Sequence, residues 1–269
     1  MSDHDKIYST KFQDKIERNT LLMFVVVAFT VAIGGIVEII PLFYLPNTGL
    51  GVDRQGQFTD FNNTRHLGPD GKVVAMDRIV WNPATSEHKT LEDWQPGDGV
   101  RPYKALELAG RAVYIREGCF LCHSQMIRPF RDEQDRYGHY SIAEESMYDH
   151  TFQWGSKRTG PDLARVAGKY SDEWHLRHLR NPRDMVPESV MPNYFWLENK
   201  PVNVARTVET MKVMTRMPFN PVPKSIYSDA YLSKAAGELK GKTDMDALIA
   251  YLQSLGNHIK FQEGVNYRD

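Results

Sequence analysis

The sequence predicts an all-α protein with long loops, anchored by one N-terminal transmembrane helix. Residues 21–40 are almost entirely apolar and long enough to form a membrane-spanning helix. Further along the chain, apolar residues recur at three- and four-residue steps, which is the helical period. Two-residue alternation, the pattern typical of a strand, is confined to a short stretch around residues 73–81. We therefore expect helices joined by loops.

Charge excludes one class of partner. The 33 basic and 34 acidic side chains in 269 residues leave a formal net charge of −1. A nucleic-acid-binding surface normally shows as a basic excess, so we expect no nucleic-acid partner. The 41% of hydrophobic residues is ordinary for a folded protein.

The apolar run carries a single ionisable residue, Glu38, near its end, where a carboxylate can reach the lipid headgroups. As a helix, twenty residues at about 1.5 Å each extend roughly 30 Å, the thickness of a bilayer core. The apolar core of a cleaved signal peptide is shorter, about 7 to 15 residues. We predict a retained anchor over residues 20–45.

Basic residues predict the orientation of this anchor. Four precede the span, namely Lys6, Lys11, Lys15 and Arg18, and the first one after it is Arg54. The preference of basic residues for the cytoplasmic side makes residues 1–19 a cytoplasmic N-terminus and places the rest of the chain outside. The prediction is a single-pass protein in contact with membrane lipid.

Beyond the anchor, we divide the chain into three parts. Residues 46–103 are rich in Gly, Pro, Asn and Asp and predict an extracytoplasmic linker, in which His66 and His88 are exposed loop histidines. Residues 104–260 form the main domain, and residues 261–269 are a C-terminal tail.

Three helices are predicted in the main domain. The first begins near Lys104 and runs into Cys119. The second covers 171–179, with Ser171 as its N-cap, and the third starts at Thr243 and stops at Gly256. Residues 181–225 contain seven prolines, so this stretch predicts mostly loop.

Both cysteines of the chain lie in the pattern C-x-x-C-H, at Cys119, Cys122 and His123. This is the attachment motif of a c-type haem, in which two thioethers hold the macrocycle and the histidine binds the iron. A zinc site needs further paired ligands, and a thioredoxin-type pair needs a βαβ setting. A disulfide is the remaining alternative. We predict one covalent haem c.

A second axial ligand must come from the loop that precedes the last helix. The methionines in that region are Met185, Met191, Met211, Met214 and Met217. Met191 and Met217 are each followed by proline, which stiffens the chain. His175 and His178 are rivals, but they lie on a predicted helix beside basic residues, where a solvated or core-edge role is favoured.

The order of these motifs resembles class I cytochromes c. Gly110 and Tyr114 lie on one face of the first helix, and residues 248–252 read L-x-x-Y-L. In that class, the small residue lets the two helices cross closely. Residues 160–163 read G-P-x-L, and the resemblance implies that the Pro161 carbonyl accepts the second N–H of the proximal histidine.

Longer blocks resemble the mono-haem cytochrome c subunit of cbb3-type cytochrome c oxidases. They are EIIPLF, KALELAGRAVYIREGCFLCHSQMIRPFRDE, FQWGSKRTGPDLARV, KYSDEWHLRHLRNPRDMVPESVMPNYFWL and DALIAYLQSLG. The resemblance implies that Met191 is the distal ligand and that Met217 is not. Residues 47–100 and 201–235 depart from the family pattern.

Cations bracket the haem motifs, at Arg128, Lys157, Arg158 and Arg165. Guanidinium groups pair well with carboxylates, so we predict Arg128, and secondly Arg158, as partners of the haem propionates. The resemblance adds a calcium ion at the interface with the catalytic subunit.

An iron with His and Met ligands has no open position, so we expect electron transfer without bond chemistry. The resemblance implies a bacterial inner-membrane subunit with a periplasmic haem domain. It would take electrons from a di-haem cytochrome c subunit or a soluble cytochrome c and pass them to a haem-copper catalytic subunit. The alternatives are the cytochrome c subunit of nitric oxide reductase and a haem-based redox or gas sensor.

Overall fold

The computed structural model describes residues 10–40, 79–149, 151–155, 157–217, 221–261 and 267. The chain divides into two units, residues 1–45 and 46–269. Several predictions lie outside the described residues: His66, the linker up to residue 78, and the tail apart from residues 261 and 267.

The first unit is helical. Helix α1 covers Lys11–Glu17, and α2 covers Thr20–Gly34 and continues as a π-helical turn over Gly35–Ile39. The Asn19 side chain caps α2 by accepting a hydrogen bond from the Leu22 N–H at 3.0 Å.

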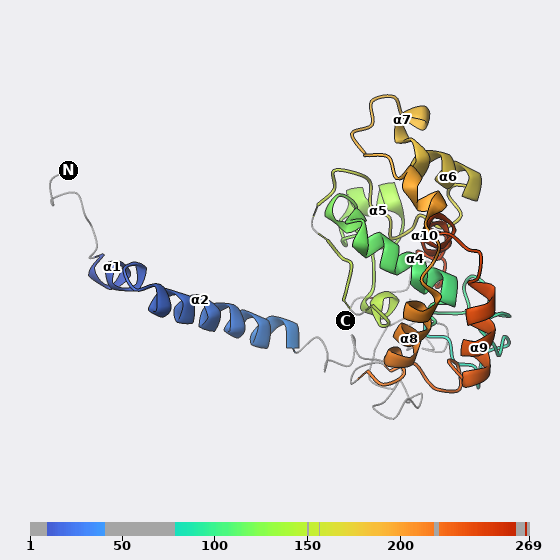
Figure 1. The fold of residues 1–269 in the computed structure, drawn as a ribbon, viewed down its shortest axis with the longest axis horizontal. Helices are drawn as coiled ribbons and strands as arrows, with labels where there is room; N and C mark the ends of the chain where they lie inside the picture. Colours follow the sequence, from blue (N-terminus) through green and yellow to red (C-terminus); the bar gives the residue numbers. More distant parts are fainter. Residues whose placement is uncertain are drawn as a thin grey trace. The chain divides into compact units, whose positions relative to one another are not determined.

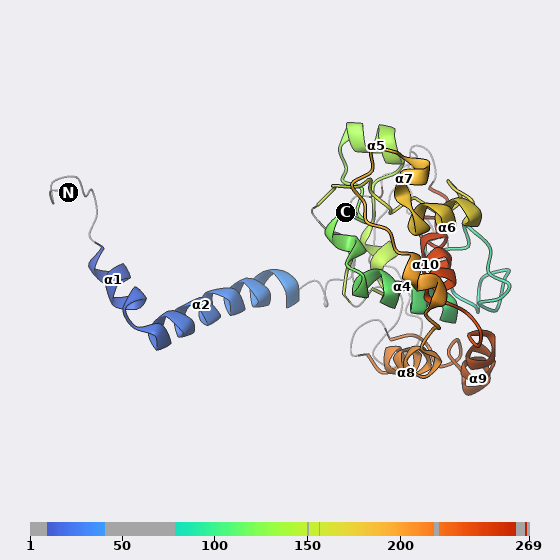
Figure 2. The same ribbon diagram turned by 45° about the horizontal axis from the view of Figure 1, so that its top comes forward.

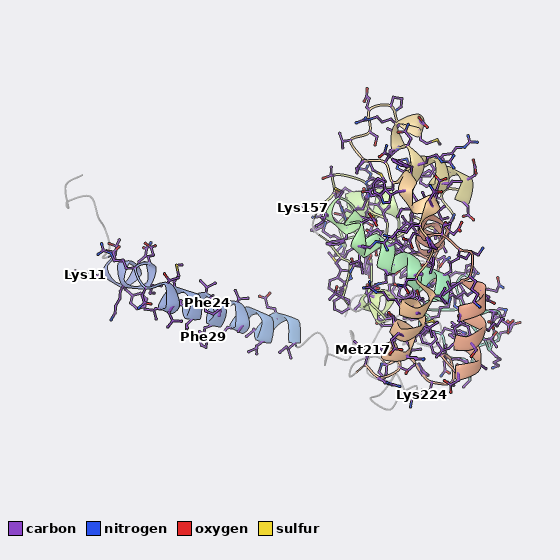
Figure 3. All side chains as sticks on the ribbon, in the orientation of Figure 1. Lys11, Phe24, Phe29, Lys157, Met217 and Lys224 are labelled. Carbon is purple, nitrogen blue, oxygen red and sulfur yellow. The ribbon has the colours of Figure 1, made fainter. Side chains whose placement is uncertain are left out.

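The stretch Thr20–Glu38 is long and apolar enough to cross a membrane, and none of it is buried within the structure. Phe24 and Phe29 project outward from α2 (Figure 3) and are 70% and 66% exposed. A helix that is apolar all round needs an apolar environment, and a bilayer supplies one. The long apolar helix that the anchor prediction requires is therefore present.

The second unit is a set of helices and single turns. Its helices are α4 (Ala105–Arg116), α5 (Arg131–Tyr137), α6 (Asp172–Arg180), α7 (Pro182–Met185), α8 (Val204–Met214), α9 (Asp229–Glu238) and α10 (Asp244–Leu252). Turns of 3-10 helix lie at Cys119–Leu121, Ala143–Ser146 and Phe195–Asn199. Within the described ranges only isolated β-bridges occur, such as Val80 with Val100. The all-α prediction is confirmed.

Helices α4 and α10 form the centre of this unit, and Figures 1 and 2 both show them side by side. Gly110 is the point of closest approach. A Cβ added there would overlap the Ala247 carbonyl and lie 2.8 Å from Tyr251 Cβ. The Tyr114 and Tyr251 rings pack beside the crossing with centroids 5.4 Å apart. Glycine is thus required by the helix contact, as the sequence pattern implied.

Side-chain caps start two of the predicted helices as expected. The Ser171 hydroxyl accepts a hydrogen bond from the Trp174 N–H at the start of α6. At the start of α10, Thr243 and Asp246 exchange hydrogen bonds in a capping box. Gly256 then adopts a φ of +88° shortly after α10 ends.

Residues 79–103 differ from the linker that we expected over 46–103. Ile79, Trp81 and Trp94 are buried in the hydrophobic core. The Gly97 and Gly99 N–H groups donate to the carbonyls of residues 257 and 258, at 3.0 and 2.9 Å. This segment is therefore part of the packed domain, fastened to the chain that follows α10.

The proline-rich region 181–225 also contains more helix than expected. Helix α8 lies inside it, capped by the Asn203 side chain, and buries Met211 and Met214. The physical reason is local, because no proline interrupts residues 202–217. Helix α8 contacts both α4 and α9, so this region adds a layer to the core.

Candidate functional site

The C-x-x-C-H segment forms a tight turn immediately after α4. The helix ends at Arg116, slightly earlier than predicted, and Gly118 adopts a left-handed φ of +75°. Cys119–Leu121 then makes one 3-10 turn, and the His123 N–H donates to the Cys119 carbonyl at 3.0 Å. Both cysteines are free thiols. The turn therefore gathers two thiols and an imidazole within five residues.

The His123 ring is fixed by the segment 160–161. Its Nδ1 lies 2.8 Å from the Pro161 carbonyl oxygen, which can only accept, so Nδ1 carries the hydrogen. A Cβ added at Gly160 would lie 2.6 Å from Nδ1 and 2.7 Å from Nε2 of this ring. The ring is thus held against backbone on one side, and Nε2 is the nitrogen that remains for a metal ion.

The loop that carries Met191 returns to the cysteines. Met191 is half-buried and packs against the core. The Tyr194 N–H donates to the Leu179 carbonyl at 2.8 Å, which ties this loop to the last turn of α6. Burial, with smaller effects from the nearby Cys119 and Cys122, raises the pKa of Tyr194 to about 12. Tyr194 therefore lies close to both thiols.

Of the two histidines of α6, His175 is buried and His178 is half-buried. His175 is 3% exposed, and its Nε2 is buried without a hydrogen-bond partner. His178 has a buried Nδ1 that also lacks a partner. Burial lowers the pKa of His178, and the neighbouring His123 lowers it further, so the side chains of His178 and His123 lie close in space.

Arg158 and Arg128 converge on one carboxylate. Arg158 pairs with Glu133 at 2.7 Å and donates to the Ser124 hydroxyl at 2.8 Å. Arg128 pairs with the same Glu133. Hydrogen bonds from Arg158 and then Arg128 lower the pKa of Glu133 to about 2. Both predicted propionate partners therefore already hold the loop after the attachment motif.

The other two basic residues near the haem motifs, Arg165 and Lys157, differ in their burial. Arg165 forms an ion pair with Glu145 at 2.5 Å and is largely buried. Lys157 is exposed and projects from the surface of the second unit (Figure 3). Neither was selected as a first choice from the sequence.

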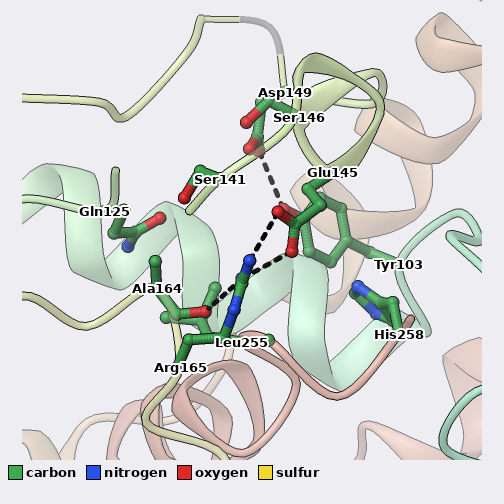
Figure 4. Close-up of a pocket in the computed structure, with 11 residues that line it drawn as sticks. Tyr103, Gln125, Ser141, Glu145, Ser146, Asp149, Ala164, Arg165, Leu255 and His258 are labelled. Atoms are coloured by element: carbon green, nitrogen blue, oxygen red, sulfur yellow. Dashed lines mark hydrogen bonds and ion pairs between the residues drawn. The ribbon is translucent and has the colours of Figure 1, made fainter. Parts of the chain in front are cut away.

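The structure also contains a small cavity that none of the C-x-x-C-H residues lines (Figure 4). It has a volume of about 40 Å³, and its lining residues include Gln125, Arg165 and His258. Each of these three has a buried nitrogen without a partner: Gln125 Nε2, Arg165 Nε and His258 Nε2. A water molecule needs roughly 10–15 Å³, so the cavity has room for two or three. No sequence pattern indicates this cavity, because residues from five separate segments of the chain form it.

The arrangement fits a haem better than the other groups considered. Two thiols, a fixed imidazole and a half-buried methionine loop lie around one region, and the buried His178 Nδ1 there awaits a partner. In the part of the chain that is described, no cluster of three or more His, Cys, Asp or Glu residues forms an ion site. A structural zinc site, which needs four such ligands, has no support there.

Helices crossing at a glycine, a C-x-x-C-H turn and a histidine held by a proline carbonyl together define a c-type cytochrome domain. Residues 83–259 match a family model described as cytochrome c oxidase, mono-heme subunit/FixO. The match covers more than half of the chain, so the chain belongs to this family. No individually curated protein matches it. The family implies a bound haem c and assembly with other oxidase subunits.

Proposed function

We propose that this chain is the electron-relay subunit of a cbb3-type cytochrome c oxidase. Cys119 and Cys122 hold one haem c covalently, and His123 and Met191 are its axial ligands. The single observation that carries this proposal is the His123 ring, whose Nδ1 is committed to the Pro161 carbonyl at 2.8 Å. That contact orients the ring for an iron at Nε2.

The residues around the ring have separate tasks. Pro161 fixes the tautomer of His123 and increases its basicity as a ligand. Gly160 allows the backbone to approach the ring. Met191 would supply the second iron ligand, and a thioether ligand favours the reduced state. When bound, the haem takes up and returns one electron, and with both axial positions filled the domain performs no bond chemistry.

The proposed location of each part of the chain rests on the sequence and on the family resemblance. Residues 1–19 are cytoplasmic, residues 20–45 span the bacterial inner membrane, and the haem domain is periplasmic. Electrons come from a di-haem cytochrome c subunit or a soluble cytochrome c and pass to the haem-copper catalytic subunit, which reduces oxygen. Nothing in the proposal requires the chain itself to bind oxygen.

Arg128 and Arg158 remain our choice for the haem propionates. Their guanidinium groups already pair with Glu133, but each has five N–H donors and can serve a second acceptor. Arg128 is the first choice because its side chain is 51% exposed, against 23% for Arg158. A calcium ion at the interface with the catalytic subunit would need ligands from both chains.

The deciding experiment is purification of the native membrane complex, with identification of its subunits and haems. We expect a haem-copper subunit, haem b and oxygen reduction by the complex. Recovery with a non-haem-iron subunit and nitric oxide reduction would overturn the proposal. A soluble signalling partner and a labile sixth ligand would instead indicate a sensor.

A further inference from the structure

A column of three stacked aromatic rings begins at Tyr170, just before the N-cap of α6, and continues along this helix. The rings of Tyr170 and Trp174 are stacked with centroids 3.9 Å apart and an interplanar angle of 16°. The rings of Trp174 and His178 follow at 4.7 Å and 14°. Residues four apart lie on one face of a helix, so each ring rests on the next. The plane of the His178 ring is therefore fixed by its neighbours.

The last ring of this column, His178, has a buried nitrogen without a hydrogen-bond partner in the described part of the chain. His178 Nδ1 has almost no contact with solvent and no hydrogen-bond partner among the described residues. Leaving a buried polar nitrogen unpaired costs free energy, and native proteins nearly always supply a partner. The stack holds the ring in one plane, so Nδ1 cannot tilt out of that plane toward water. A partner must therefore come from something that binds at this place.

The position of His178 indicates what binds there. The next residue, Leu179, accepts the hydrogen bond from Tyr194 that holds the Met191 loop against α6. The ring also lies close enough to His123 for the two imidazoles to interact electrostatically. His178 is thus near the proximal histidine and adjacent in sequence to the residue that holds the loop of the proposed distal ligand.

A bound haem brings hydrogen-bond acceptors to this region and no competing donors. Its ionised propionates are strong acceptors, and the Met191 sulfur is a weak one. We propose that His178 is a positioning residue for the haem, whose Nδ1–H donates to an acceptor of the haem–Met191 assembly, while Trp174 holds the ring in place. This inference rests on the proposed function, because it requires the haem.

The predicted consequence concerns the reduction equilibrium of the haem. A hydrogen bond to either acceptor withdraws electron density from it and so favours the reduced iron. Removing the donor should therefore lower the midpoint potential. We expect a change in the equilibrium constant of roughly three- to tenfold, and tenfold corresponds to about 59 mV for one electron.

The test uses the whole purified oxidase complex with three variants. His178→Phe keeps a flat ring on Trp174 but has no donor. His178→Asn loses the stack but keeps an N–H donor near the place of Nδ1. His175→Phe is the matched control, because it makes the same change on the same helix at a ring that shows no interaction with His123. Haem c is titrated through its visible absorption.

We expect a lowered potential in His178→Phe, and values near that of the unmodified complex in His178→Asn and His175→Phe. If His178→Phe does not incorporate haem, His178→Ala replaces it with the same expectation. An unchanged potential in the donor-free variant overturns the inference. The Met-to-iron charge-transfer band separates the two acceptors, since it shifts if the acceptor is the sulfur and stays if it is a propionate.

A different result would separate this inference from the proposed function. If the unmodified complex shows the magnetic spectrum of two histidine ligands, His178 is an iron ligand and the positioning role is wrong. If the chain carries no covalent haem at all, the proposed function fails with it. If the haem is ligated by methionine but its midpoint potential does not change in His178→Phe, only the positioning role of His178 is overturned.

Discussion

In the proposed function, Met191 is the second iron ligand. Without it, the haem would have an open coordination position and would not be a pure electron carrier. Met191→Leu keeps the size and apolar character of the side chain but removes the sulfur. We expect covalent haem to remain, the Met-to-iron charge-transfer band to disappear, and the midpoint potential to fall, because thioether ligation favours the reduced iron. Near-infrared absorption of the oxidised complex measures the band.

Met217→Leu is the control for this change. It lies in the same long connection and is also followed by proline, but it is not expected to bind the iron. A band that survives in Met191→Leu and vanishes in Met217→Leu would show that the ligand was assigned to the wrong methionine.

A substitution at Gly160 tests whether the His123 ring must be held close to the backbone. A Cβ at this position would lie within 2.7 Å of both His123 ring nitrogens, which is too close for any packing. We expect Gly160→Ala to push the ring from the Pro161 carbonyl and to lower the fraction of chains that carry haem several-fold. Haem staining of the denatured subunit, compared with its protein content, measures this fraction.

Gly237→Ala is a suitable control for Gly160→Ala. Gly237 lies in α9, and a Cβ there meets nothing within 4 Å. Alanine favours a helix over glycine by about 1 kcal/mol. If Gly160→Ala loads haem as fully as this control does, the close approach of backbone and imidazole has no importance for the site.

At the scale of elements, Glu133 fastens α5 to the segment before the G-P-x-L motif. It is 3% exposed and paired with Arg158 and Arg128, and its pKa lies at about 2 instead of 4.5. A carboxyl group whose pKa is lowered by folding stabilises the protein above its unfolded pKa. That stabilisation is lost as the pH falls from about 4.5 to about 2.

Glu133→Gln should therefore unfold at a lower temperature at pH 7 and should lose part of the acid dependence between these two pH values. Circular dichroism of the purified chain in detergent, measured from pH 7 to pH 2, tests both points. Glu173→Gln is the control, because Glu173 pairs with Arg177 on the surface, where such pairs contribute little. Equal melting curves for the two variants would contradict the prediction.

Helices with local signals could be predicted from the sequence, and those without could not. Ser171 and Thr243 mark α6 and α10 through caps that involve only the next three residues. The crossing at Gly110 was expected only through the resemblance to class I cytochromes c. Helix α8 was missed because the high proline content of 181–225 hid a stretch without proline.

The same limit applies to the site. His123 and the cysteines are adjacent in sequence, so one motif predicts them together. Other contacts join residues that are distant in the sequence. Glu133 and Arg158, which form an ion pair, are 25 positions apart. His123 and His178, which interact electrostatically, are 55 positions apart. Residues 79–103 pack against chain beyond residue 256. Such contacts have no local pattern, so the sequence indicated neither the ion pair of Arg158 with Glu133 nor the closeness of His178 to His123, and it predicted a linker over residues 79–103.

At the scale of the whole molecule, the two units are chemically different. The span Thr20–Glu38 has no buried residue, whereas the second unit has its own core, built around α4 and α10. A unit with its own core is expected to fold by itself. We therefore expect the anchor to keep the cytochrome domain at the membrane and the domain to fold without it.

Replacing residues 1–45 by a cleavable export signal tests this division. We expect a soluble periplasmic product that carries covalent haem and keeps the Met-to-iron band, because Cys119, Cys122, His123 and Met191 all belong to the second unit. Haem staining and near-infrared absorption of the periplasmic fraction measure both. The same replacement should lower the amount of this chain that copurifies with the oxidase, since the domain is no longer held at the membrane. An insoluble or haem-free product would show that the first unit contributes to folding, and full recovery with the oxidase would show that the domain, not the anchor, holds the subunit in the complex.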